Sequence, residues 1–164
     1  MDLQNLRTSY RPAQVNMLFV GESPPASGRF FYRADSGLYR ATRSAFVRAF
    51  PSLESVEFLD SFRQLGCYII DLCDSPVDQL PKGQRRNICA ESESGLARQI
   101  VELQPRTMVT TVRSIAANLR RALGTAHWTG DYVELPYPGR WRKHQVLFEE
   151  RLVPLLRREL HPQV

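Results

Sequence analysis

The sequence predicts an α/β fold: a single domain over residues 1–164, with a central four-stranded parallel sheet between flanking helices. Short apolar runs alternate along the chain with longer segments of helical spacing, which is the pattern of βαβ units. The apolar runs are continuous rather than alternating, as in strands that are buried on both faces. No internal repeat or linker divides the 164 residues, which suffice for one core of ordinary size.

Four apolar runs are predicted as the strands. The first is followed directly by Gly21, and the second reads CYIIDLC, with polar residues at Asp71 and Asp74. The third is rich in β-branched residues, which favour strands. The predicted strands span residues 15–20, 67–73, 107–112 and 132–135.

Helices are predicted between these strands and after the last one. Thr42 is expected to cap a helix that ends before Pro51. Gly124 is expected to close another. The segment SPVDQLPKGQRR, residues 75–86, carries two prolines and is predicted as a loop with a basic end. The remaining predicted helices span residues 91–103, 114–123 and 145–160.

The charge of the chain points weakly towards nucleic acid. Its net charge is +5 and its sequence pI about 9.4, and Lys82 and Lys143 are the only lysines among 22 basic residues. Arginine forms forked hydrogen bonds to phosphate and stacks on bases. A GC-rich genome would also produce an arginine-rich chain, so the composition leaves both explanations open.

Several classes of protein are disfavoured. No apolar run approaches the ~20 residues of a membrane span, and the first residues lack a secretory signal, so we expect an intracellular, cytoplasmic protein without a membrane partner. Cys67, Cys73 and Cys89 are odd in number and have no CxxC spacing, so we expect buried free thiols and no metal. Neither a dinucleotide nor a P-loop glycine motif is present.

Three polar segments are predicted to converge at the carboxyl ends of the strands, where such sheets bind ligands. GESPP, residues 21–25, follows the first strand, residues 71–76 follow the second, and PYPGRWR, residues 136–142, follows the fourth. Phe30, Phe31 and Tyr32 are expected to offer flat faces on which a planar ligand stacks. The alternative is an ordinary turn with its aromatic residues in the core.

These segments resemble the two motifs of the uracil-DNA glycosylase superfamily. The first motif is a glycine, a polar residue, a variable residue and a proline, with an aromatic residue downstream, matched here by residues 21–25 and Phe30 or Phe31. The second has the form HPSP or NPSG and is matched by LPYPG, residues 135–139. The resemblance covers nearly the whole chain and implies base flipping and hydrolysis of a glycosidic bond.

The resemblance implies catalytic roles in the first motif. Glu22 matches the acid of the iron–sulfur branch, where a carboxylate orients water and stabilises positive charge on the sugar. Ser23, the second catalytic candidate, stands where other branches carry asparagine or aspartate, but it is too short and too neutral to do that work well. The cysteines that bind the iron–sulfur cluster are not all present, so we expect no cofactor.

The base-reading position implied by the resemblance is Asp71, which replaces an asparagine of uracil enzymes. A carboxylate accepts hydrogen bonds, and an acid recognises cytosine through its N4 amine. Pro25 replaces a tyrosine that crowds C5 of the base, so a C5 substituent is expected to fit. Together they predict a C5-modified cytosine, for example in foreign DNA such as a phage genome. The alternative is that Asp71 caps a loop or pairs with an arginine.

The second motif departs from the family at Leu135, where other members place a histidine that donates to O2 of the leaving base. His144, Tyr137 or a backbone N–H is expected to replace it, and Tyr137 is also predicted to contact the base. Arg140 or Trp141 is predicted to enter the duplex as a wedge, or else Trp141 packs on the core beside a solvated basic helix start. The predicted DNA contacts, most of them to phosphate, are Arg142, Lys143, His144, Lys82, Arg85 and Arg86.

The resulting functional prediction is a monomeric, cofactor-free, monofunctional DNA glycosylase that excises a modified pyrimidine and leaves an abasic site. Three alternatives remain open. The first is a uracil or thymine-mismatch repair enzyme, and the second is a catalytically weak nucleic-acid-binding relative. The third is an unrelated α/β enzyme that uses Glu22 as a base on a small molecule.

Overall fold

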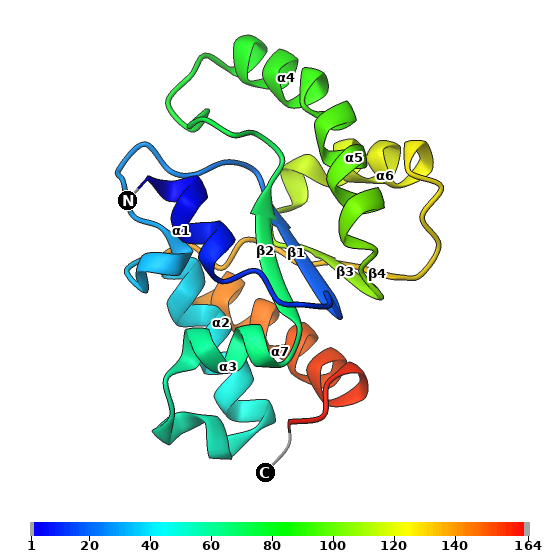
Figure 1. The fold of residues 1–164 in the computed structure, drawn as a ribbon. Helices are drawn as coiled ribbons and strands as arrows, with labels where there is room; N and C mark the ends of the chain where they lie inside the picture. The colour runs from blue at the N-terminus through cyan, green and yellow to red at the C-terminus, as the bar shows by residue number, and fades with distance from the viewer. Residues whose placement is uncertain (1, 163–164) are drawn as a thin grey trace.

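Four parallel strands form one sheet at the centre of the molecule (Figure 1), as the sequence predicted. The computed structural model describes residues 2–162. The strand order is β2-β1-β3-β4, with each neighbouring pair parallel. The strands are β1 (Met17–Gly21), β2 (Cys67–Asp71), β3 (Thr107–Thr110) and β4 (Asp131–Glu134).

The register of the sheet places the strand ends side by side. Val20 pairs with Ile70 on one side and with Thr110 on the other, and Gly21 lies opposite Asp71. All residues of β1 and β3 are buried, as expected for strands covered on both faces. β4 lies at an edge and is only partly buried. The carboxyl ends of β1, β2 and β3 therefore meet at one edge of a buried platform.

Helices cover both faces of the sheet and leave this edge accessible. In Figure 1, α5 and α6 lie on one side of the sheet, α2, α3 and α7 lie on the other, and α4 extends beyond the upper end of the strands. No helix within residues 2–162 is long and apolar enough to cross a membrane. The helices are α1 (Leu3–Ser9), α2 (Gly37–Ala49), α3 (Phe58–Gln64), α4 (Lys82–Glu91), α5 (Glu93–Leu103), α6 (Ala116–Thr125) and α7 (Arg142–Glu159).

Three local predictions are wrong. Ser36, not Thr42, caps α2: its hydroxyl accepts a hydrogen bond from the Tyr39 N–H, and Thr42 is buried inside the helix. Gly124 lies within α6 rather than closing it. The predicted loop 75–86 ends at Pro81, because proline is tolerated at a helix start and the basic residues after it continue as α4.

The sequence analysis did not anticipate α1 and α3. Each has only seven residues, which is too short for helical periodicity to be distinctive. Both depend on tertiary packing, as helices of this length do. Asp2 caps α1 by accepting a hydrogen bond from the Asn5 N–H at 2.8 Å.

A cluster of phenylalanine rings packs between the sheet and the helices on one face. Phe62 lies at its centre, with ring centroids 5.2 Å from Phe31, 5.5 Å from Phe46 and 5.7 Å from Phe58. Phe31 follows the first motif, so this cluster fixes the chain just downstream of Glu22. The cysteines are all free and buried, as predicted.

We expect Phe62→Ala to lower the free energy of unfolding by about 3–5 kcal/mol, because it leaves a cavity inside the cluster. The matched control is Val101→Ala on α5, where the side chain is 56% exposed and truncation should change stability by less than about 0.5 kcal/mol. Urea denaturation followed by circular dichroism measures both. Equal losses in the two variants would contradict the central position of Phe62.

Candidate active site

A cavity of about 300 Å³ opens at the carboxyl ends of β1 and β2. Its size is at the lower end of small-molecule sites, and it suits one base-sized ring better than a dinucleotide. The structure brings the three predicted segments together there, since Glu22, Asp71 and Tyr137 all line it. The wall also contains Arg7, Gly21, Ser23, Pro24, Pro25, Phe30, Phe31, Ser36, Leu38, Ile69, Asp78, Arg85, Thr111 and Val112.

The chain that carries Glu22 is fixed by hydrogen bonds beyond the end of β1. The Leu72 N–H donates to the Gly21 carbonyl at 2.9 Å, and the Cys73 N–H donates to the Glu22 carbonyl at 2.8 Å. These bonds continue the pairing of β1 with β2 past the strands themselves. The backbone of Glu22 is therefore as well positioned as a residue within the sheet.

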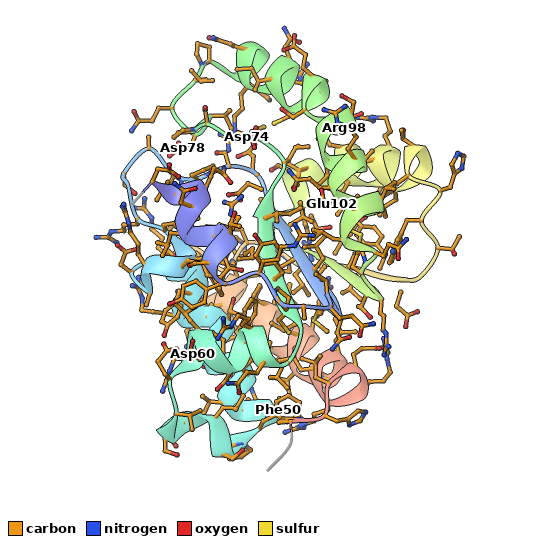
Figure 2. All side chains as sticks on the ribbon, in the orientation of Figure 1. Phe50, Asp60, Asp74, Asp78, Arg98 and Glu102 are labelled. Atoms are coloured by element: carbon orange, nitrogen blue, oxygen red, sulfur yellow. The ribbon has the colours of Figure 1, made fainter. Side chains whose placement is uncertain are left out.

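Side chains tie the proline-rich loop to the segment that follows β2. The Ser23 hydroxyl accepts a hydrogen bond from the Val77 N–H at 3.2 Å, and the Ala26 N–H donates to Asp78 Oδ1 at 3.1 Å. Figure 2 shows Asp74 and Asp78 on this segment, between β2 and α4. Ser23, one of the two predicted catalytic residues, thus has a structural role in bracing the wall of the cavity.

The Glu22 carboxylate forms a two-point ion pair with Arg85. Arg85 Nε donates to Oε2 at 2.9 Å and Nη2 donates to Oε1. The Cys89 thiol lies 3.8 Å from Oε2, and burial raises its pKa to about 12, so it remains a protonated donor. The sequence placed Arg85 in a loop as a phosphate contact; it lies on α4 with its guanidinium held by Glu22. Lys82 and Arg86 are exposed on the same helix.

Asp71 is bound by a buried arginine from the N-terminal helix. Arg7 Nη2 donates to Asp71 Oδ2 at 2.6 Å, and both side chains are largely buried. Burial raises the pKa of Asp71, and the Arg7 guanidinium opposes that rise. The alternative that Asp71 pairs with an arginine therefore describes the structure, and the same carboxylate also faces the cavity.

The aromatic residues after the first motif have different roles. Phe30 and Phe31 line the cavity, although both are almost fully buried. Tyr32 belongs to the core: its hydroxyl accepts a hydrogen bond from the Ile69 N–H at 2.9 Å. The alternative of aromatic residues in the core therefore describes Tyr32, whereas Phe30 and Phe31 are buried and also line the cavity, where stacking on a ligand stays a prediction.

In the second motif, Tyr137 lines the cavity and Leu135 does not. Leu135 is 0% exposed, and its N–H donates to the Thr110 carbonyl at 2.8 Å, so a histidine here would be buried in the core. Two residues later Tyr137 lines the cavity and remains half exposed. Burial raises the pKa of Tyr137, so its hydroxyl stays protonated and can donate. His144 is exposed and is not part of the cavity wall.

The segment after Tyr137 projects to the surface. Gly139 has a positive φ of 49°, and its carbonyl accepts a hydrogen bond from Gln145 Nε2 at 2.8 Å. Trp141 is 66% exposed, so the alternative in which it packs on the core is wrong. Arg140, Arg142 and Lys143 are also exposed and lie outside the cavity wall.

Arg7 is the arginine of the cavity wall that the sequence analysis missed. It is only 5% exposed and lines the cavity, yet it lies before β1 and in neither of the two motifs. The one available signal was its spacing from Leu3, Leu6 and Tyr10, which are now seen to pack against the core. That spacing would have predicted an amphipathic first helix, but not that an arginine occupies its inner face.

No protein-family model matches the chain, and a search of curated proteins gives no significant match. Within residues 2–162, no group of three or more histidine, cysteine, aspartate or glutamate side chains is placed to hold a metal ion. Functional conclusions therefore depend on the geometry of the cavity and on the chemistry of its residues.

Gly21→Ala is expected to lower the free energy of unfolding by about 1–3 kcal/mol, the usual cost of overpacking. A Cβ at this position would lie 2.6 Å from Asp71 Oδ1 and would push the carboxylate away from Arg7. Gly83→Ala is the control, because a Cβ there meets open space on α4 and should stabilise the helix by about 0.5–1 kcal/mol. Chemical denaturation compares the two, and a neutral Gly21→Ala would disprove the close contact.

Proposed function

We propose that the protein is a monofunctional DNA glycosylase that flips a pyrimidine out of DNA and hydrolyses its glycosidic bond. The preferred base is a C5-modified cytosine, in foreign DNA such as a phage genome, and the enzyme acts as a cytoplasmic monomer without a cofactor. The observation that carries the proposal is the meeting of Glu22, Asp71 and Tyr137 on one base-sized cavity. They come from three strand ends that are far apart in the sequence.

In the proposed reaction Glu22 acts at the sugar. As the bond between C1′ and the base breaks, its electron pair leaves with the base and positive charge develops on the sugar. The Glu22 carboxylate stabilises that charge and accepts a proton from the water that adds to C1′. A carboxylate has about four acceptor positions; Arg85 occupies two and the Cys89 thiol a third, so one remains for a water molecule.

Tyr137 acts at the base. Negative charge accumulates on the departing pyrimidine, including its O2 atom, and a donor aimed at that oxygen lowers the barrier. In the resembling family a histidine at the position of Leu135 has this role. Here Leu135 is buried in the core, and the protonated hydroxyl of Tyr137 is the nearest replacement along the chain.

The proposed DNA surface surrounds the mouth of the cavity. Trp141 is the exposed apolar side chain suited to fill the gap left by the flipped base. Exposed basic residues in the segments that carry the cavity residues Tyr137 and Arg85 would contact phosphates. The exposed basic residues are Arg140, Arg142, Lys143 and His144 near the start of α7, with Lys82 and Arg86 on α4.

Pro25 supports the preference for a modified base. It lines the cavity, and by the resemblance it stands where a tyrosine crowds C5 in uracil enzymes; its ring is smaller. A C5 substituent would gain room there. Asp71, as an acceptor, supplies the hydrogen bond for an N4 amine.

A second candidate is a nucleic-acid-binding relative with weak catalysis. The observation that favours it is the two-point contact of Arg85 with Glu22, which holds the proposed catalytic carboxylate in an ion pair. Binding of DNA by such a protein would be salt-dependent, but no base would be released. The next experiment separates the two.

Glu22→Gln is expected to reduce base release by about 10²–10⁴-fold, because a neutral amide neither stabilises the sugar cation nor accepts a proton. DNA binding should persist. The assay incubates oligonucleotides, each with one central cytosine, 5-substituted cytosine or uracil, and scores alkali-labile sites. Glu93→Gln is the matched control, since Glu93 has a similar pairing with Arg121 away from the cavity and should leave the rate unchanged.

Three outcomes would contradict parts of the proposal. Preferred release of uracil would identify a repair enzyme instead of one for modified cytosine. If the unsubstituted protein binds DNA in a salt-dependent way but releases no base, the binding-only alternative would be established. Absence of DNA affinity would leave a small-molecule enzyme.

Tyr137→Phe is expected to slow base release by about 10²-fold while DNA affinity changes less than about twofold, because only the donor to the leaving base is removed. Tyr132→Phe is the control: its hydroxyl bonds Thr110 Oγ1 at 2.8 Å and lies outside the cavity wall, so its loss should not alter the rate. Single-turnover kinetics measure both variants. Equal rates for the two would assign the donor role elsewhere.

A further inference from the structure

Arg7 and Asp71 form a buried ion pair inside the wall of the cavity. Arg7 reaches it from α1, a helix that belongs to neither motif, and its Nη2 lies 2.6 Å from Asp71 Oδ2. The guanidinium carbon lies 5.2 Å from the centroid of the Phe30 ring, so the group is held on an aromatic face. Both partners line the cavity.

One buried donor atom of this pair has no hydrogen-bond partner. Among the buried side-chain nitrogen and oxygen atoms of residues 2–162, Arg7 Nε is the one without a hydrogen-bond partner. Buried donors are nearly always paired, because an unpaired one forfeits the hydrogen bond that water would give. A ligand atom that accepts a hydrogen bond from Arg7 Nε would remove this cost.

The pair therefore combines an acceptor and a donor at one place. Asp71 Oδ2 accepts from Arg7, while Oδ1 lies against Gly21 and keeps acceptor capacity. The guanidinium keeps N–H donors beyond the one used for Asp71. An asparagine amide offers the same combination in neutral form, with an oxygen that accepts and a nitrogen that donates.

We propose that Arg7 and Asp71 together read the base, with Asp71 accepting from an exocyclic amine and Arg7 donating to the adjacent ring nitrogen. This inference rests on the proposed function and specifies its substrate as a 4-aminopyrimidine. Arg7 is then a specificity-determining residue for the flipped base. Its donor is what a carboxylate alone cannot supply.

A cytosine-type edge fits the pair better than a uracil-type edge. In cytosine the N4 amine and the N3 acceptor are neighbours, and they match Asp71 and Arg7 in turn. Uracil has a single N–H between two carbonyl oxygens. If that N–H bonds Asp71, one carbonyl can face Arg7 but the other faces the carboxylate, which repels it.

The test removes single atoms from the base. Single-stranded oligonucleotides carry one central 5-methylcytosine, its 3-deaza analogue, 5-methyl-2-pyrimidinone or thymine. The 3-deaza base lacks the acceptor for Arg7, and the pyrimidinone lacks the amine for Asp71. Affinities are measured with Glu22→Gln protein so that no base is hydrolysed, with and without Arg7→Met.

With Arg7 present, the 3-deaza change should weaken binding by about 10–100-fold, the range for a hydrogen bond to a charged group. In the Arg7→Met protein the same change should cost less than about threefold. An equal loss in both proteins, or no loss with Arg7 present, overturns the proposal. The pyrimidinone should weaken binding to both proteins.

Arg7→Met leaves Asp71 buried without its partner and can impair folding. The double variant Arg7→Met/Asp71→Asn removes both charges and keeps an amide that accepts and donates. Because the neutral amide no longer repels the second carbonyl of thymine, the preference for 5-methylcytosine over thymine should be lost. An unchanged preference for 5-methylcytosine overturns the proposal.

An assay of base release by the unsubstituted protein, which keeps Glu22, separates this proposal from the proposed function. Its substrates are 5-methylcytosine and the 3-deaza analogue. Selective affinity without release of either base would refute hydrolysis and support the reading pair. Release of both bases at equal rates, with equal affinities, would support hydrolysis and refute the reading pair.

Discussion

The close approach of Gly21 to Asp71 is the constraint on which the candidate site depends. The two residues are opposite each other at the last position of the β1–β2 register, and the Asp71 carboxylate occupies the space where a Cβ of residue 21 would lie. A glycine is required there because a Cβ would collide with the Asp71 carboxylate, and not because of an unusual φ. With this contact formed, the next residue, Glu22, starts at the rim of the cavity while Asp71 stays in its wall.

Two of the carboxylates that line the cavity, Asp71 and Glu22, are held under different conditions. Asp71 is paired with an almost fully buried arginine, and burial raises its pKa. Glu22 is paired with Arg85, whose side chain is partly exposed on α4. A buried ion pair fixes geometry at a cost in desolvation, whereas a partly exposed one exchanges partners more easily. In the proposed reaction Asp71 would be the fixed reader of the base and Glu22 would accept a hydrogen bond from water, and this difference fits those two roles.

The surroundings of the cavity are consistent with a polyanionic ligand. α4 extends beyond the strand ends and carries exposed basic residues, and the start of α7 carries others beside the exposed Trp141 (Figure 1). The two groups come from distant parts of the sequence. Most of the surface of the cavity is apolar, so its charged groups act in a medium that screens them weakly.

The sequence by itself determined the sheet, its four strands and the convergence of three segments at the strand ends. Continuous apolar runs, a glycine and prolines are local signals, and they report burial and turn geometry directly. It did not determine what the side chains contact. Arg7 beside Asp71, Arg85 on Glu22, the burial of Leu135 and the exposure of Trp141 were decided by tertiary packing. The two ion pairs join residues more than sixty positions apart. No local periodicity encodes which buried charge meets which partner.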